Sequence, residues 1–153
     1  HLPPDELVET LHKAAEQVSA ADLTLAIEVE DGFWADTGAN TAALLKAVNH
    51  PALRVNWDPG NAFQAGESPF PEGYAHVRDN VVHVHFKDII KQADGSFEYR
   101  VEGAIDWSGQ IRALVDDGYD GFISVETHMS PQVASARAAT RRLLRLIETA
   151  TAD

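Results

Sequence analysis

Four side chains that are able to bind a divalent cation each stand at the end of a short apolar run. The runs have strand length and are rich in Leu, Ile and Val, and they end, in chain order, on Glu28, Asp58, His85 and Glu126. In a parallel α/β barrel the carboxyl ends of the strands meet at one mouth, where the active site lies. We therefore expect these four side chains to face one another around one metal ion.

Three of the four assignments have a competing interpretation. Side chains two positions apart share a face of a strand, so Glu30 competes with Glu28, and His83 competes with His85. Asp58 also opens an Asp-Pro-Gly-Asn sequence, in which an Asp commonly caps a turn without binding anything else.

Further polar and aromatic residues near the strand ends are candidates for substrate contact: Asn61, Lys87, His128 and Trp34. Each has a structural alternative. Asn61 suits a turn, Lys87 has Asp88 as a neighbouring ion-pair partner, and aromatic residues most often pack in a core.

Patterns of helical length separate the apolar runs. Helices are expected over residues 5–19, 36–48, 72–78 and 106–117 and from 130 onward, with strands near 23–29, 53–57, 81–87 and 121–126. Residues 88–104 are expected to be the least regular stretch, with a turn at 93–96 flanked by short extended pieces, and Glu67 falls in an expected loop. The arginines of the last helix are expected on a solvated outer face: Arg137, Arg141, Arg142 and Arg145.

Composition limits the class of protein. The chain has 153 residues, 44% of them hydrophobic, which suits one globular domain. A formal net charge of −12 repels polyanions and argues against a nucleic-acid partner. Cysteine is absent, which excludes disulfides and thiolate metal ligands. Since no apolar run approaches the roughly 20 residues of a membrane span, we expect a cytoplasmic protein without a membrane partner.

The number of predicted strands is half of what a closed barrel needs. A complete (β/α)8 barrel takes about 250 residues and eight strands, so residues 1–153 are expected to form a half-barrel. Half a barrel exposes two strand edges and, we expect, an apolar lining. The expected partner is therefore a missing N-terminal half-barrel or a second copy of the chain.

The order of the motifs is similar to that of a known family. Five segments resemble, in order, the C-terminal half of sugar phosphate isomerases and epimerases. They are Ala26-Ile-Glu28, Trp57-Asp-Pro-Gly-Asn61, His83-Val-His-Phe-Lys-Asp88, Glu102-Gly-Ala-Ile-Asp-Trp107 and Gly118-Tyr-Asp-Gly-Phe-Ile-Ser-Val-Glu126. These are xylose isomerase-like TIM barrels. The family's Gly-Glu-Gly appears here as Val101-Glu102-Gly103, a small departure.

The resemblance implies an enzyme with one divalent metal, Mn²⁺ or Mg²⁺ first and Co²⁺ or Zn²⁺ as alternatives. It implies that Glu28, Asp58, His85 and Glu126 are the metal ligands, and that Glu28 and Glu126 also act as bases. The implied reaction is isomerisation or epimerisation of a sugar or sugar-like polyol, by proton transfer next to a carbonyl through a metal-stabilised enediolate.

Three other functions are weighed against this one. A metal-dependent dehydratase of an inositol-type substrate would use similar ligands. A half-barrel that lacks a complete site would be a non-catalytic fragment or interaction module. A DNA-repair enzyme like endonuclease IV is disfavoured, because the chain is acidic, carries Asn61 where that group has a His, and lacks that group's Asp-x-His pair.

Overall fold

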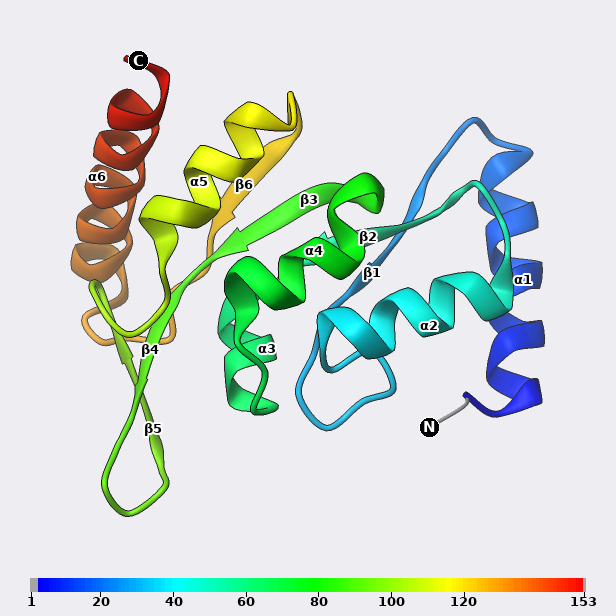
Figure 1. Ribbon diagram of the computed structural model, residues 1–153, viewed down its shortest axis with the longest axis horizontal. Helices are drawn as coiled ribbons and strands as arrows, with labels where there is room; N and C mark the ends of the chain where they lie inside the picture. The colour runs from blue at the N-terminus through cyan, green and yellow to red at the C-terminus, as the bar shows by residue number, and fades with distance from the viewer. Residues whose placement is uncertain (1–2, 153) are drawn as a thin grey trace.

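The computed structural model describes residues 3–152, in which helices and strands alternate (Figure 1). In chain order the longer elements are α1 (Asp5–Ser19), β1 (Leu25–Glu28), α2 (Gly38–Val48), β2 (Leu53–Trp57), α3 (Pro59–Gln64), α4 (Tyr74–Val77), β3 (Val81–Phe86), β4 (Asp88–Lys91), β5 (Phe97–Arg100), α5 (Trp107–Asp116), β6 (Phe122–Val125) and α6 (Gln132–Thr151). Short π-helical and 3₁₀ turns at Pro69–Gly73 and Arg78–Asn80 flank α4.

One four-stranded sheet organises the molecule. Its strand order is β1-β2-β3-β6, and every neighbouring pair is parallel. Parallel strands need crossover connections, and here the crossovers contain the helices that cover one face of the sheet (Figure 1). This is the parallel (β/α) arrangement that the sequence predicts. Within residues 3–152, β1 and β6 are its two edges.

The face of the sheet toward the helices holds the core. Val55, Trp57, Val84 and Phe86 alternate along β2 and β3 and are at most 1% exposed. Two indole N–H groups fix α5 to this layer: Trp57 Nε1 donates to Gln110 Oε1 at 2.8 Å, and Trp107 Nε1 donates to the Lys87 carbonyl at 3.0 Å. These bonds hold the carboxyl ends of β2 and β3, where the candidate site lies.

The opposite face of the sheet is mostly polar, so the prediction of an apolar lining was wrong. Arg54, Asn56, His83 and Ser124 lie on it, on the same side as the side chains at the strand ends. Ala26 and Phe122 are apolar residues on this face, and 81% of the Phe122 surface is exposed. A half-barrel therefore leaves an open polar surface.

One local prediction was wrong, and two were confirmed with added detail. Asp58-Pro-Gly-Asn61 is the start of helix α3 and not only a turn, because Pro59 suits the first helical position and Asp58 caps it. Residues 88–104 contain the predicted turn between short extended pieces, which pair as the antiparallel hairpin β4–β5 at the bottom of Figure 1. Glu67 lies in a loop, as predicted, and its carboxylate accepts hydrogen bonds from Gly38 N and Ala39 N at the start of α2.

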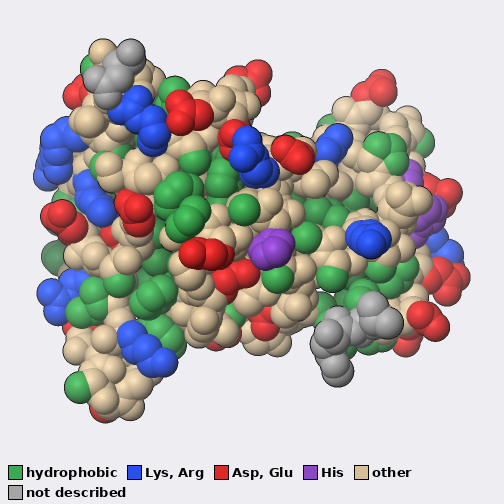
Figure 2. Space-filling view, in the orientation of Figure 1, with side chains coloured by type: hydrophobic (Ala, Val, Ile, Leu, Met, Phe, Trp, Pro, Cys, Tyr) green, Lys and Arg blue, Asp and Glu red, His purple; other side chains and the backbone are tan. Residues whose placement is uncertain are grey.

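The arginines of α6 divide into two groups. Arg137, Arg141 and Arg145 are exposed, as predicted, and Figure 2 shows basic side chains gathered over this helix. Arg142 instead turns inward, and its Nη1 donates to the buried carboxylate of Asp88 at 2.7 Å and to the Val101 carbonyl at 2.8 Å. It thereby ties α6 to β4 and to the loop that follows β5. Among the described helices, none is long and apolar enough to span a bilayer.

Candidate metal centre

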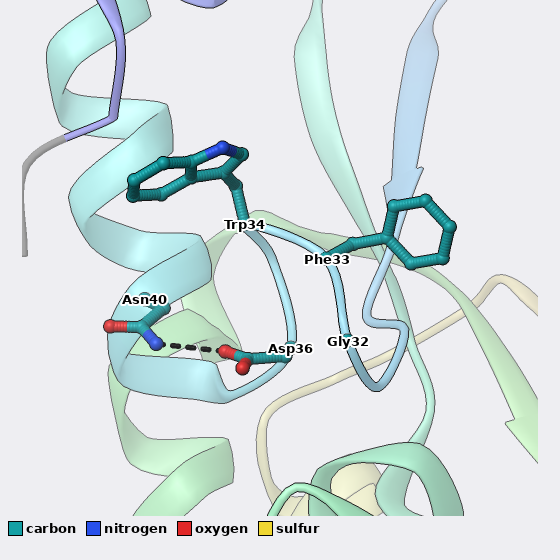
Figure 3. Close-up of a pocket in the computed structure, with 5 residues that line it drawn as sticks. All are labelled: Gly32, Phe33, Trp34, Asp36 and Asn40. Atoms are coloured by element: carbon teal, nitrogen blue, oxygen red, sulfur yellow. Dashed lines mark hydrogen bonds between the residues drawn. The ribbon is translucent and has the colours of Figure 1, made fainter.

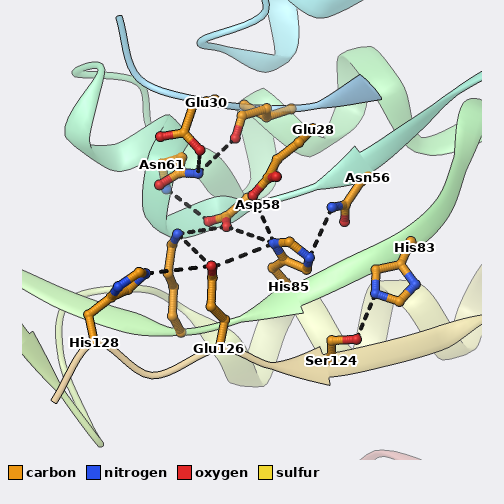
Figure 4. Close-up of polar contacts among 12 residues, drawn as sticks. Glu28, Glu30, Asn56, Asp58, Asn61, His83, His85, Ser124, Glu126 and His128 are labelled. Atoms are coloured by element: carbon orange, nitrogen blue, oxygen red, sulfur yellow. Dashed lines mark hydrogen bonds and ion pairs between the residues drawn. The ribbon is translucent and has the colours of Figure 1, made fainter. Parts of the chain in front are cut away.

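The four predicted ligand residues meet at one end of the parallel sheet (Figure 4). Glu28 is the last residue of β1, Asp58 follows β2, His85 lies near the end of β3, and Glu126 follows β6. One ligand-type atom from each lies within 4.8 Å of the others, and within residues 3–152 they make the one such group of three or more His, Asp or Glu side chains. Four separate strands therefore supply one site.

His85 is at the centre of the group. Its Nδ1 lies 2.9 Å from Glu28 Oε1, 3.4 Å from Asp58 Oδ2 and 3.5 Å from Glu126 Oε2. The close Asp58 carboxylate raises the pKa of His85, with the charges of Glu28 and Glu126 adding to the effect and burial opposing it. The imidazole thus faces three acids through a single nitrogen.

Asp58 has two separate roles, one for each carboxylate oxygen. Its Oδ1 accepts the Asn61 backbone N–H at 2.9 Å and caps α3, as one of the two sequence interpretations expected. Its Oδ2 points to the centre and makes no well-aligned hydrogen bond, although Lys87 Nζ lies 2.9 Å away. Since the Asp58 side chain is fully buried, the cap fixes the direction of the oxygen that faces the site.

Lys87 lies among the ligands and does not pair with Asp88, which corrects one interpretation of the sequence. Its Nζ is 2.9 Å from Asp58 Oδ2 and 2.8 Å from Glu126 Oε2. Burial opposes a charge on Lys87, but the two carboxylates outweigh it and raise the pKa of the ammonium. Asp88 points to the other face of the strand, where Arg142 binds it.

The competing residues lie beside the group and not in it. Glu30 accepts a hydrogen bond from Asn61 Nδ2 at 3.1 Å, and the same nitrogen lies 2.9 Å from the Val29 carbonyl, so Asn61 is a buried structural link. Burial, and then the charge of Glu28, raise the pKa of Glu30. His83 Nε2 pairs with Ser124 Oγ at 2.8 Å, deeper along the sheet.

The two remaining substrate candidates lie in different places. His128 is beside the group, with Nε2 3.6 Å from Glu126 Oε1. Trp34 instead lines a separate open hollow of about 490 Å³ with Phe33, Asp36 and Asn40 (Figure 3). Two other aromatic residues near the strand ends are not at the site, since Trp57 is buried in the core and Phe63 packs against it.

Two residues that sequence reasoning missed also border the site. Tyr99, from the hairpin β4–β5, packs its ring 4.5 Å from that of His128. Asn56 lies 3.0 Å from His85 Nε2. The alternation along β2 carries a signal for Asn56, since it shares a face with Asp58 two residues later.

The donor set fits a divalent cation. Asp58 Oδ2 and His85 Nδ1 are both buried and lack a well-aligned hydrogen bond, and both point to the point where Glu28 and Glu126 converge. Buried polar atoms are normally hydrogen-bonded, so the direction of these two atoms suits a cation held between them. Three carboxylates and one imidazole are ligands of Mn²⁺ and Mg²⁺, with other divalent metals as alternatives.

Known proteins resemble the chain over more than half of its length. Inosose dehydratase from Lacticaseibacillus casei is 23% identical over 154 residues, a match that covers 88% of this chain and 51% of that protein. A 3-dehydroshikimate dehydratase from Bacillus anthracis is 27% identical over 84 residues, covering 55% of this chain and 30% of that protein. The chain thus spans about half the length of the inosose dehydratases that it matches.

Solved structures show the same fold. A xylose isomerase-like TIM barrel protein from Mycobacterium smegmatis, in complex with magnesium, has a TM-score of 0.78 at 22% identity, covering 99% of this chain and 54% of that one. An L-ribulose 3-epimerase has a TM-score of 0.74 at 18% identity, covering 98% of this chain and 57% of that one. The sequence model of the xylose isomerase-like TIM barrel family matches residues 4–149. As the motifs predicted, the chain belongs to the xylose isomerase-like TIM barrel family.

Proposed function

We propose that this chain carries the metal centre of an enzyme that transfers a proton next to a carbonyl in a sugar or sugar-like polyol. The observation that carries the proposal is the convergence of Glu28 and Glu126, from the two opposite edges of the sheet, on one centre with Asp58 and His85. The ligands are these four residues, and the metal is Mn²⁺ or Mg²⁺. When bound, the cation would polarise the carbonyl and stabilise the negative charge that grows on its oxygen.

Glu28 and Glu126 have the position that a proton-transfer pair needs. Their side chains are 37% and 34% exposed, whereas Asp58 is fully buried, so the two glutamates form the open rim of the centre. A carboxylate on one side of a substrate can remove a proton, and a carboxylate on the other side can return it. Lys87 Nζ lies beside Glu126 and is placed to donate to a substrate oxygen.

Isomerisation or epimerisation is the first candidate reaction, and dehydration is the second. Both start with removal of a proton next to a carbonyl. An isomerase or epimerase returns the proton, whereas a dehydratase expels a hydroxyl group from the neighbouring carbon. The match to inosose dehydratases over 88% of the chain favours an inositol-type ketone as the substrate of the second candidate.

A test offers the Mn²⁺-loaded chain, together with an N-terminal half-barrel that completes it, a panel of ketohexoses and inosose in D₂O, followed by NMR. For an epimerase we expect deuterium at the carbon next to the carbonyl, and for a dehydratase we expect loss of water from the substrate. Glu126→Gln should lower turnover by about 10²–10⁴-fold, because it removes a base. Glu148→Gln, at an exposed position of α6, is the control and should change nothing. Exchange that needs no metal, or equal turnover in both variants, would contradict the proposal.

We also propose that this chain acts together with an N-terminal half-barrel, as the C-terminal half of a complete barrel. The exposed edges β1 and β6, the open polar face and the coverage of about half of the relatives support this proposal. A closed pair of two copies would instead bring two acidic centres to one mouth, where like charges repel. Sedimentation of the chain with and without such a half-barrel tests it, and a stable, fully active monomer would contradict it.

A further inference from the structure

Asn56 makes an unusual contact with the central histidine of the metal centre. Its Nδ2 lies 3.0 Å from His85 Nε2, the ring nitrogen that faces away from the three carboxylates. Its Oδ1 is buried and has no hydrogen-bond partner. Figure 4 shows the Asn56 amide beside His85, on the side opposite to Glu126. The Asn56 side chain therefore contacts the nitrogen of the His85 ring that faces away from the carboxylates.

The pairing of β2 with β3, in which β3 carries the extra residue Val82, sets the place of Asn56. The pairing of β2 with β3 shifts register between Val55 and Asn56, so that Val55 pairs with Val81 but Asn56 pairs with His83. An irregularity of this kind re-aims a side chain relative to the neighbouring strand. On its other side Asn56 pairs with Glu28, and its carbonyl accepts the Val29 N–H at 3.1 Å. The backbone of Asn56 is thus paired with both neighbouring strands, which fixes where its side chain starts.

The contact bears directly on which nitrogen of His85 carries a proton. A neutral imidazole has one donor and one acceptor nitrogen, and only the nitrogen without a proton can bind a metal. With Asn56 Nδ2 toward Nε2, the proton lies on Nδ1, which faces the carboxylates. Half a turn of the amide brings Oδ1 to Nε2, which then carries the proton and leaves the Nδ1 lone pair free. The ring remains neutral, because Nε2 gains the proton that Nδ1 loses.

We infer that Asn56 is a positioning residue, whose carbonyl accepts the His85 Nε2–H and so presents Nδ1 to the cation. The inference rests on the proposed metal centre and adds to it a residue that touches neither the cation nor the substrate. Metal-binding histidines generally donate their second N–H to such a partner, and loss of the partner weakens metal affinity about 10–100-fold. Asn56 Oδ1 is buried and has no hydrogen-bond partner, and half a turn of the amide brings it to Nε2 for this role.

The test measures Mn²⁺ binding by calorimetry in three forms of the protein: wild type, Asn56→Leu and Ser124→Ala. Ser124 is the matched control, because it bonds the neighbouring His83 on the same face of the sheet at 2.8 Å. We expect Asn56→Leu to weaken Mn²⁺ binding about 10–100-fold and Ser124→Ala to leave it unchanged. Circular dichroism confirms that each variant is folded.

Nitrogen-15 NMR of the histidine rings reads the tautomer without any assay of activity. In the Mg²⁺-loaded wild type, His85 Nε2 should carry the proton, and Asn56→Asp, whose carboxylate only accepts, should keep it there. An unprotonated Nε2 in the loaded wild type, or wild-type Mn²⁺ affinity in Asn56→Leu, would overturn the inference while leaving the metal centre intact. A wild type that binds neither ion would overturn the metal centre as well.

Discussion

The two faces of the β1-β2-β3-β6 sheet differ both in composition and in what covers them. The face under the helices is apolar and sealed, with Trp57 and Phe86 at most 1% exposed. The other face is polar and open, and it ends in the four ligand residues. Because strand residues alternate between faces, Phe86 lies in the core between His85 and Lys87, which both belong to the site.

This difference separates stability from chemistry. The helix-covered face supplies the buried apolar area that stabilises a fold, at about 25 cal/mol per Å². The open face supplies charges, which are costly to bury and useful at a site. The chain can therefore hold these four side chains in place from one side only, and under our proposal the open side remains for a substrate and for an N-terminal half-barrel.

The largest expected effect on stability comes from Phe86, on the sealed face. The ring centroids of Phe86 and Trp107 are 4.4 Å apart, and Arg142 Cζ lies over the Phe86 ring, 5.7 Å from its centroid. Phe86→Ala should lower the free energy of unfolding by about 3–5 kcal/mol, because it leaves a cavity. Ser124→Ala, on the open face, should change it by less than about 0.5 kcal/mol. Urea unfolding measures both, and equal effects would break the contrast between the faces.

A second prediction concerns the pair Asp88–Arg142, which lies on the sealed side. Asp88 Oδ1 accepts the N–H groups of Ile89 and Ile105, and Oδ2 accepts from Arg142. Arg142→Ala would leave a fully buried carboxylate without its cation, which should cost about 3 kcal/mol. The exposed Arg141→Ala is the control and should cost almost nothing. Similar unfolding curves for the two variants would show that Arg142 only lies near Asp88.

A third prediction concerns the open face and a bound metal. A cation that binds only the folded chain should add about 2.7 kcal/mol of stability at a concentration of 100 times its dissociation constant. Glu28→Gln should remove most of this gain without changing the stability of the metal-free protein, because Glu28 lies on the exposed rim. Thermal unfolding with and without Mn²⁺ tests it. A gain that survives in Glu28→Gln would exclude Glu28 as a ligand.

The smallest expected effect is a loss of stability at alkaline pH, caused by two tyrosines that pack on the helix-covered side of the sheet. Burial, with the hydrogen bond to Asp117, raises the pKa of Tyr74 above its ordinary value, and burial raises the pKa of Tyr119 to about 12. A raised pKa means that the stability from these groups is complete below pH 10 and is lost as the pH rises through the folded-state values. Absorbance titration should show both tyrosines ionising late. Ionisation of Tyr119 near pH 10 in the folded protein would contradict its burial.

The sequence allowed the centre to be predicted because its geometry follows from strand direction alone. Four apolar runs that end on ligand-type residues needed only to be parallel and adjacent, and they are. The helix α3 was missed because Asp-Pro-Gly-Asn is also a turn signal. Alternation would have excluded the pairing of Lys87 with Asp88, since consecutive strand residues point to opposite faces.

Other features depend on tertiary contacts that no local pattern records. Arg142 stands in a row of arginines, and only the packing of α6 against β4 distinguishes it from Arg141. Alternation places Asn56 on the same face as Asp58, but the shift in β2–β3 register that pairs it with His83 is not visible in the sequence of β2. The polar lining of the open face was visible in the alternation of Arg54, Asn56 and Asp58 along one side of β2, but the usual apolar interior of small barrels outweighed it.

Anomalous diffraction from crystals of the protein soaked in Mn²⁺ tests the central claim most directly. We predict one strong peak within about 2.0–2.6 Å of His85 Nδ1 and of carboxylate oxygens from Glu28, Asp58 and Glu126. Lys87 should withdraw from Asp58 Oδ2 when the peak is present. A peak bound by other residues, or no peak while Lys87 keeps its two carboxylate contacts, would contradict the assignment of these four strand ends as a metal centre.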